Sequence, residues 1–224
     1  MHAAARQLPR LRLLPLLLPL CWAAASAPAP AAAEPAAAGS GARLLANEPP
    51  ELVARLRAQR MVLLEQVQSG GPGAGDFFVA YVIFEQPPGR VFELLAQPTR
   101  QMEYRPEVDA MEIVSRGEGE LVVEQHMSVV FVPIVYRLRH RLDREAGRVS
   151  WALDPSFENS LRRVEGYWEL FDLDGARTLG RFGTLVDVGP ALPRSFQDVL
   201  TRKTVLRAVE GARRWVDSGG TWRP

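Results

Sequence analysis

Six apolar, strand-like segments follow one another between residues 108 and 188, with only short turns between them. They are rich in β-branched and aromatic residues, and Gly, Pro and Asn mark the turns. The expected strands are 108–116, 120–131, 134–142, 148–153, 163–173 and 177–188, with another before them at 76–85. Strands so close in sequence pair antiparallel, because parallel pairing needs a crossover of a dozen or more residues. The sequence therefore predicts one antiparallel sheet of about seven strands.

A long helix is expected after the last strand, at residues 192–216. Pro193 suits its first turn, and Ser195 with Asp198 has the form of a capping box. Its apolar residues form two faces, rotated from one another. The first face is Phe196, Val199 and Leu200, and the second is Val205, Leu206, Val209, Ala212 and Val216. The helix either buries both faces in an ordinary core, or packs on the sheet with one half and covers a cavity with the other.

Two short helical segments stand between the first two strands. Pro88 opens the first, which carries Val91, Phe92, Leu94 and Leu95, and Pro98 ends it. A second turn is expected at 101–106. One strand, two short helices, six strands and a long helix indicate an α+β domain over residues 76–217, in which a curved sheet wraps on the C-terminal helix.

Alternation along the strands predicts which side chains face the core. In 134–142, Tyr136, Leu138, His140 and Leu142 should face inward, and Arg137, Arg139 and Arg141 outward. A turn at Val132 and Pro133 places Glu124, His126 and Ser128 opposite Arg141, Arg139 and Arg137. It leaves Leu121, Val123, Gln125, Met127 and Val129 inside. In 163–173 the inner face holds either Glu165 and Tyr167 or Gly166 and Trp168. We favour an exposed Glu165, because Trp168 and Leu170 are the side chains to bury.

The N-terminus has the pattern of a secretory signal peptide, expected at residues 1–25. Arg6, Arg10 and Arg12 precede an apolar run at 13–22, and small residues follow it, with cleavage near Ala25 or Ala27. We therefore expect a secreted or periplasmic protein. A lipoprotein is the less favoured alternative, because Leu20 stands before Cys21 where a lipobox has a small residue.

Low-complexity sequence follows the leader, and residues 26–46 are expected to form a disordered Ala/Pro-rich tether. Residues 47–70 are expected to form an accessory helix, since Leu52, Val53, Leu56, Leu63, Leu64 and Val67 have helical spacing. Either this helix docks on the domain, or its Arg55, Arg57 and Arg60 mark a membrane-facing or lid segment. Residues 218–224 are a short tail.

Charge and composition exclude several classes. Without the leader the chain has 24 basic against 26 acidic side chains and no basic patch, so nucleic acid is an unlikely partner. The single cysteine, Cys21, lies in the leader, which excludes disulfides and thiolate chemistry from the mature chain. His126 and His140 are too few for a histidine-rich metal site, and we expect neither a metal nor a cofactor.

Three stretches resemble a known superfamily over residues 76–216. They are 104–114 (YRPEVDAMEIV), 164–170 (VEGYWEL) with 175–179 (GARTL), and 188–193 (VGPALP). Their order and spacing are similar to those of the START-like, or polyketide cyclase/coenzyme Q-binding (SRPBCC), superfamily with its helix-grip fold. The resemblance implies an apolar cavity between the sheet and the last helix. It also implies binding or transport of a lipid, sterol or quinone-like molecule, or a cyclase built on the same scaffold.

Cavity-lining residues are then expected among the inward-facing aromatic and methionine side chains, with His140 or Arg163 as polar anchors. The set is Tyr81 or its strand neighbours, Phe92, Met102, Tyr104, Met127, Tyr136, His140, Trp151, Arg163, Trp168, Phe196, Val199 and Leu200. No enzyme's catalytic motif matches these positions, so we expect no catalytic residue. His140 is either a hydrogen-bonded core residue or a general base beside a carboxylate.

The leading hypothesis is a carrier of a hydrophobic small molecule or lipid, with transient membrane contact as one alternative for delivery. A cyclase- or hydrolase-like enzyme is the second hypothesis and predicts converging titratable groups inside the cavity. A structural domain with a filled core is the third. The sequence leaves the ligand and the oligomeric state open.

Overall fold

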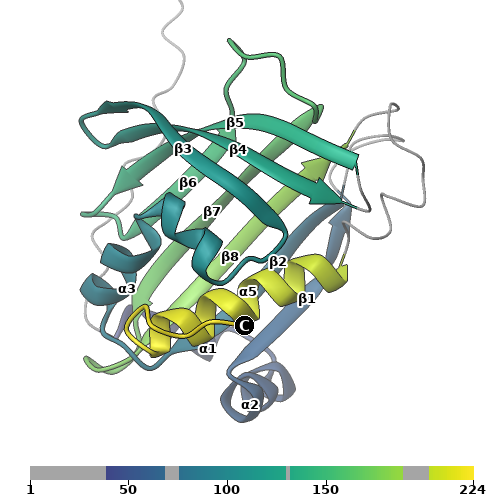
Figure 1. The fold of residues 1–224 in the computed structure, drawn as a ribbon. Helices are drawn as coiled ribbons and strands as arrows, with labels where there is room; N and C mark the ends of the chain where they lie inside the picture. Colours follow the sequence, from purple (N-terminus) through teal and green to yellow (C-terminus); the bar gives the residue numbers. More distant parts are fainter. Residues whose placement is uncertain (1–38, 69–75, 130–131, 189–201) are drawn as a thin grey trace, which may run out of the picture. The chain divides into compact units, whose positions relative to one another are not determined.

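Eight antiparallel strands form one sheet in the order β1-β2-β8-β7-β6-β5-β4-β3, and helix α5 lies across one face of it (Figure 1). The computed structural model describes residues 39–68, 76–129, 132–188 and 202–224. All of them belong to one compact unit of the chain, Ala33–Pro224.

The elements follow the predicted order. The strands are β1 (Met61–Gln68), β2 (Asp76–Phe84), β3 (Val108–Gly117), β4 (Glu120–Val129), β5 (Val132–Asp143), β6 (Arg148–Leu153), β7 (Arg163–Asp172) and β8 (Thr178–Asp187). The helices are α1 (Ser40–Ala46), α2 (Pro50–Gln59), α3 (Pro88–Leu95), the 3-10 helix η1 (Pro98–Glu103) and α5 (Arg202–Asp217). The α+β helix-grip prediction is confirmed, with one strand more than expected.

The additional strand, β1, corrects the predicted helix at 47–70. Helix α2 ends at Gln59, and Arg60 takes a left-handed conformation with φ 62°. The chain then runs as β1, antiparallel to β2 with Met61 opposite Val82. The sequence misled because a short apolar run fits helical and strand spacing equally well, and pairing with β2 decided between them.

Helix α1 corrects the predicted tether at 26–46, because Ser40–Ala46 is helical. Gly41 allows α1 to approach the sheet, since a Cβ there would lie 3.0 Å from the carbonyl oxygen of Asp172. Burial of Leu45 then holds the short helix against the sheet. The expected signal peptide at 1–25 lies outside the described residues.

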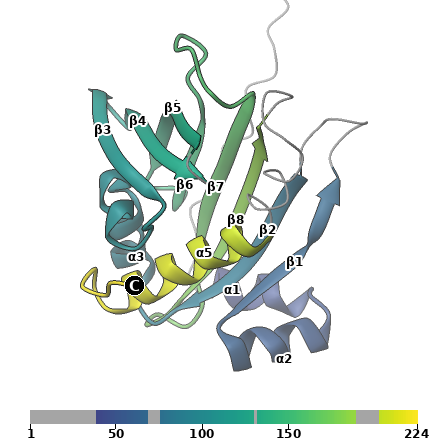
Figure 2. The same ribbon diagram turned by 45° about the vertical axis from the view of Figure 1, so that its right-hand side comes forward.

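Strand β2 is buried on both faces, which explains its continuous apolar sequence. Ala80, Val82 and Phe84 face α5. Tyr81 and Ile83 face the other way, into a second apolar cluster with residues of α1 and α2. Figure 2 shows α1 and α2 near the β1 and β2 end of the sheet. Helices α1 and α2 therefore cover part of the sheet face opposite α5.

The β4–β5 hairpin confirms the predicted faces and corrects the predicted register. Arg137 lies opposite Glu124, and Arg141 lies opposite Glu120, whereas the sequence placed Glu124 opposite Arg141. Val129 pairs with Val132, so Val132 and Pro133 belong to β5 and do not form the turn. Because the shift is even, every side chain keeps its predicted face.

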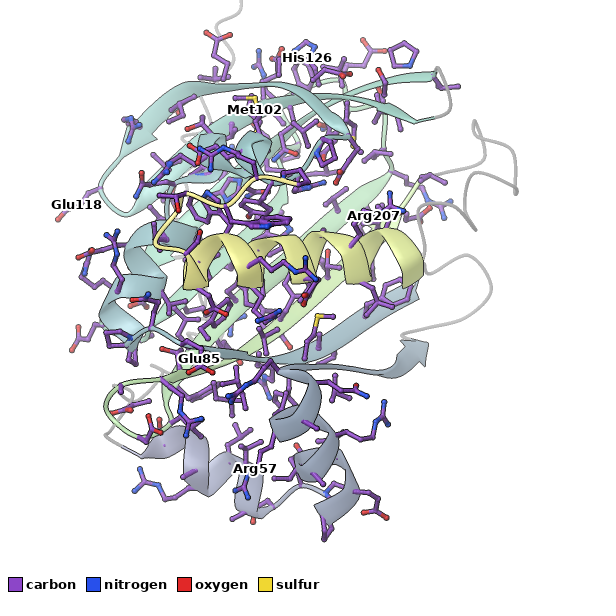
Figure 3. The ribbon with its side chains drawn as sticks, turned by 60° about the horizontal axis from the view of Figure 1, so that its bottom comes forward. Arg57, Glu85, Met102, Glu118, His126 and Arg207 are labelled. Atoms are coloured by element: carbon purple, nitrogen blue, oxygen red, sulfur yellow. The ribbon has the colours of Figure 1, made fainter. Side chains whose placement is uncertain are left out.

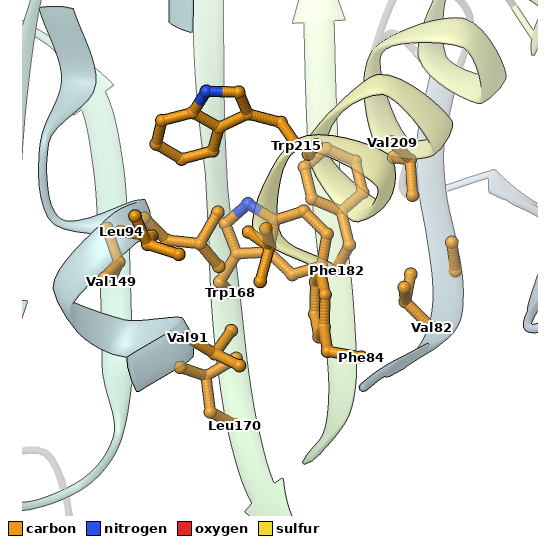
Figure 4. Packing of buried hydrophobic residues seen from close by; sticks show 14 of the residues in the cluster. Val82, Phe84, Val91, Leu94, Val149, Trp168, Leu170, Phe182, Val209 and Trp215 are labelled. Carbon is orange, nitrogen blue, oxygen red and sulfur yellow. The ribbon is translucent and has the colours of Figure 1, made fainter. Parts of the chain in front are cut away.

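Helix α5 packs its buried face on β2, β7 and β8. Val205, Val209, Ala212 and Val216 are buried, as predicted for the second apolar face. Trp168 and Phe182 lie beneath the helix with Phe84 beside them (Figure 4). The Trp215 indole N–H donates to Glu103 at 2.8 Å, which fastens the end of α5 to η1. Residues 192–201, the expected first half of the helix, lie outside the described part of the chain.

Candidate functional site

A cavity of about 140 Å³ lies between the sheet and α5. Its wall comes from η1 and the residues after it, from the inner faces of β4 to β8, and from α5. The lining residues are Gln101, Tyr104, Arg105, Gln125, Met127, Ile134, Tyr136, Leu138, His140, Trp151, Leu161, Val164, Trp168, Phe182, Thr184, Val186, Thr204, Val205, Ala208, Val209 and Ala212. An engineered protein cavity of about 150 Å³ binds benzene, so this space suits a ligand with a core of one or two rings.

Aromatic rings dominate one side of the cavity. Trp168 and Phe182 have ring centroids 4.8 Å apart, and Trp151 lies 5.9 Å from Phe182. Gly166 makes room for the Trp151 indole, since a Cβ there would collide with that ring and lie 2.6 Å from the carbonyl oxygen of Gly183. The glycine in the middle of β7 is therefore a requirement of the cavity wall.

A polar group of side chains lies at another part of the wall. The Tyr136 hydroxyl donates to the side-chain oxygen of Gln125 at 2.7 Å. The Arg105 guanidinium donates to Glu107 at 2.9 Å and to the Gln101 side-chain oxygen at 3.0 Å. Burial raises the pKa of Tyr136, which keeps its phenol protonated at neutral pH. These contacts neutralise the one charged side chain among the described lining residues.

His140 is the second polar feature of the wall. It projects from β5 and is 2% exposed, and its Nε2 atom has no hydrogen-bond partner among the described residues. Burial lowers the pKa of His140 to about 4, so the imidazole is neutral at pH 7. A general base works best with a pKa near the working pH. Neither predicted alternative for His140 is met in the described residues, since the described wall holds no carboxylate and the buried Nε2 atom has no hydrogen-bond partner there.

Six of the predicted lining residues meet in the cavity wall: Tyr104, Met127, Tyr136, His140, Trp151 and Trp168. Four lie elsewhere, and each has a physical reason. Tyr81 faces the opposite side of the sheet and donates to Glu48 at 2.7 Å, and Phe92 is a residue of α3 that is buried in the main core cluster. Met102 is 40% exposed on η1 (Figure 3). Arg163 is on the outer face, paired with Glu165.

Phe196, Val199 and Leu200 lie outside the described residues. These three residues were expected to line the cavity from the first half of the helix; in the described part of α5 the lining residues are Thr204, Val205, Ala208, Val209 and Ala212. Gly166 and Trp168 face inward on β7, and Glu165 outward, as favoured from the sequence.

Sequence reasoning missed Arg105 and the β8 residues Phe182 and Thr184. The two β8 residues could have been predicted, because Arg181 marks the outer face of the strand and alternation then places Phe182 and Thr184 on the inner face. Arg105 could not be found this way, since it lies in a turn between η1 and β3 where no periodicity applies.

Other features of the described residues limit the chemistry. No cluster of three or more His, Cys, Asp and Glu side chains suited to a metal occurs in the described ranges. None of the helices in those ranges is long and apolar enough to cross a membrane. Helix α2 docks on the sheet through the buried Leu56, as in the first of the two predicted alternatives, and it contributes no side chain to this cavity wall.

The comparison with family models decides the family. Residues 78–214 match the model described as polyketide cyclase/dehydrase and lipid transport. The chain belongs to this family. The match begins within β2 and ends within α5, so it covers the sheet except β1, all the residues that line the cavity and most of α5. A search of curated proteins finds no significant match. Membership in the polyketide cyclase/dehydrase and lipid transport family supports hydrophobic-ligand binding or cyclase chemistry on this scaffold.

Solved structures share the fold of the family. The chain is similar to an aromatase/cyclase from Streptomyces sp. R1128, with 19% identity and a TM-score of 0.53 over 71% of this chain and 93% of that one. It is also similar to a STAR-related lipid transfer protein from Xanthomonas axonopodis, with 14% identity and a TM-score of 0.54 over 70% of this chain and 98% of that one. Human StAR-related lipid transfer protein 5 gives 13% identity and a TM-score of 0.54, with 80% and 97% covered. These likenesses confirm the helix-grip fold.

Proposed function

We propose that this protein binds and carries a small hydrophobic ligand in the cavity under α5, without chemical turnover. The observation that supports this most is the wall itself: aromatic and aliphatic side chains surround the space, and its one charged group in the described ranges, Arg105, is already paired with Glu107. Burying about 200 Å² of apolar surface contributes about 5 kcal/mol at 25 cal/mol per Å², which is the main favourable term for a ring-sized ligand and offsets the freedom that the ligand loses on binding.

A cyclase is the alternative that the family allows. Such an enzyme needs a positioned acid or base in contact with its substrate. The lowered pKa of His140 makes its imidazole a weak base, and the raised pKa of Tyr136 makes its phenol a weak acid, so neither group is suited to that role at neutral pH. Incubation with an aromatic polyketide precursor, followed by mass spectrometry, tests this alternative. A cyclised product that forms only in the presence of the protein would show that the protein is an enzyme and would contradict the carrier proposal.

We also propose that the mature protein is secreted or periplasmic, and that lipid-like molecules are its cargo. The leader pattern at 1–25 supports export, and in an aqueous compartment an apolar ligand gains most from a shielded site. Intact-mass measurement of the secreted protein tests this. Cleavage after Ala25 or Ala27 is expected, and a full-length cytoplasmic product would contradict it.

The binding function is tested by filling the cavity. Ala208 lines the space on α5, while Arg207, the preceding residue, is exposed (Figure 3). Native mass spectrometry of the purified protein should show a co-purifying hydrophobic molecule in the wild type and the Arg207→Trp variant. The Ala208→Trp variant should lose it while remaining folded by circular dichroism. Equal occupancy in both variants would place the ligand outside this cavity.

A further inference from the structure

His140 has hydrogen-bonding capacity that the described part of the protein does not use. Buried side-chain nitrogen and oxygen atoms almost always have a partner. In the described residues two such atoms lack one, Nε2 of His140 and Oγ of Ser40. Ser40 begins α1 and does not line the cavity. His140 does line it, so a molecule bound there is the available partner.

The surroundings of His140 are otherwise apolar. Its neighbours across the sheet are Leu121 on β4 and Trp151 on β6. The Trp151 ring centroid lies 6.2 Å from that of the imidazole. The nearest inward side chain on β5 is Leu138, and the Gln125 oxygen already accepts from Tyr136. The imidazole is therefore a single polar group in an apolar part of the wall.

The protonation state defines which ligand group fits. Burial holds the pKa of His140 near 4, so the ring is uncharged at neutral pH and offers one donor and one acceptor nitrogen. A hydroxyl can use either nitrogen, and a carbonyl can accept from the N–H. A carboxylate would bring a charge into the cavity, where Arg105 is already occupied by Glu107, and burial of an unpaired charge is unfavourable.

The shape of the wall defines the rest of the ligand. Trp151, Trp168 and Phe182 present aromatic rings to a space of about 140 Å³. Flat rings pack against such side chains in stacked or tilted arrangements. We propose that the cavity selects an uncharged planar ring compound bearing a hydroxyl or carbonyl group, which hydrogen-bonds to the His140 imidazole. This inference rests on the proposed binding function and names its ligand class.

Three probes of one ring size separate the contributions. Naphthalene measures apolar burial alone, 2-naphthol adds a neutral hydroxyl, and 2-naphthoate adds a negative charge. Isothermal titration of the mature protein at pH 7 should give 2-naphthol an affinity about three- to tenfold above that of naphthalene, the range expected for one net hydrogen bond. 2-Naphthoate should bind more weakly than naphthalene.

Variants assign the preference to His140. His140→Phe keeps a ring and removes both nitrogens. Naphthalene should still bind to this variant, and 2-naphthol should bind with about the same affinity as naphthalene. His140→Gln retains hydrogen-bonding groups and should restore part of the preference. His126 is the matched control, because it lies on the outer face of β4, half-exposed and bonded to Glu124. His126→Phe should keep the wild-type preference. Circular dichroism verifies the fold of each variant.

The outcomes separate this inference from the proposed function. If 2-naphthol and naphthalene bind equally, or if the preference survives in His140→Phe, the cavity binds ligands but His140 does not select them, and the inference is wrong. Tighter binding of 2-naphthoate would also overturn it. If none of the three probes binds, the inference is wrong; the proposed binding function fails with it only if the purified wild type also carries no hydrophobic molecule in native mass spectrometry.

Discussion

Replacing Gly166 by alanine should both destabilise the protein and reshape its cavity. Gly166 lies in the middle of β7, where the Trp151 indole from β6 crosses over it. An added Cβ would overlap the indole and come within 2.6 Å of the carbonyl oxygen of Gly183 on β8. The carbonyl belongs to the sheet backbone and cannot move freely. The indole is therefore the group that must move.

The size of the effect follows from these contacts. Overpacking a core by one methyl group costs typically 1–3 kcal/mol, and a backbone clash places Gly166→Ala at the upper end, about 3 kcal/mol. A domain of this size loses about 3 °C in Tm for each kcal/mol, so we expect a fall of about 9 °C. Because the displaced indole enters the cavity, the affinity for 2-naphthol should fall about tenfold or more.

Urea unfolding followed by circular dichroism measures the first effect, and titration measures the second. Gly117→Ala is the matched control, since Gly117 ends β3 and a Cβ there meets nothing within 4 Å. That variant should stay within about 0.5 kcal/mol of the wild type. Adding Trp151→Phe to Gly166→Ala should recover part of the loss, because the two sites are in contact. If Gly166→Ala is as mild as Gly117→Ala, the explanation of the cavity wall is refuted.

Three further predictions concern other contacts. The pKa of His140 is about 4 in the folded protein and 6.5 in the unfolded chain. Between these two pH values the unfolded chain binds a proton at His140 and the folded protein does not. The free energy of unfolding should therefore fall by about 3 kcal/mol as the pH drops from 6.5 to below 4. Urea unfolding across this range should show the slope, and His140→Phe should lack that contribution. Tyr81→Phe removes the 2.7 Å hydrogen bond to Glu48 and should cost about 1 kcal/mol in the same assay; no change would mean that the contact is not formed in solution. Arg60→Gly removes the steric strain of a non-glycine residue at positive φ and should raise the free energy of unfolding by about 0.5–1 kcal/mol. The exposed ion pair between Arg60 and Glu85, which is lost in this variant, contributes little. A lower Tm would contradict this prediction.

Strand alternation was the most informative pattern in the sequence. Arginines at 137, 139 and 141 fixed the outer face of β5, and through it the inward positions of Tyr136 and His140. A register error of an even number of residues leaves each side chain on its predicted face, which is why the β4–β5 shift did no harm to the predicted wall.

Local patterns failed where tertiary contacts decide. Residues 61–68 have spacing suited to a helix, yet pairing with β2 makes them a strand. Residues 40–46 have few large apolar side chains, but close packing on the sheet at Gly41 allows them to form a helix. Arg105 and Glu107 meet near the cavity through a turn, and only three-dimensional geometry reveals that contact.

The two-sided burial of β2 has a consequence for the N-terminal segment. The family match begins at Phe78, within β2, so the match lacks β1, α1 and α2. A chain trimmed to this region would expose one hydrogen-bonding edge of β2 and the apolar side chains Tyr81 and Ile83. An uncovered, apolar edge strand is a template for intermolecular β-pairing and aggregation. Because the 39–68 segment pairs with β2 and covers Tyr81 and Ile83, we expect the solubility of the protein to depend on it, even though it contributes no side chain to the cavity wall.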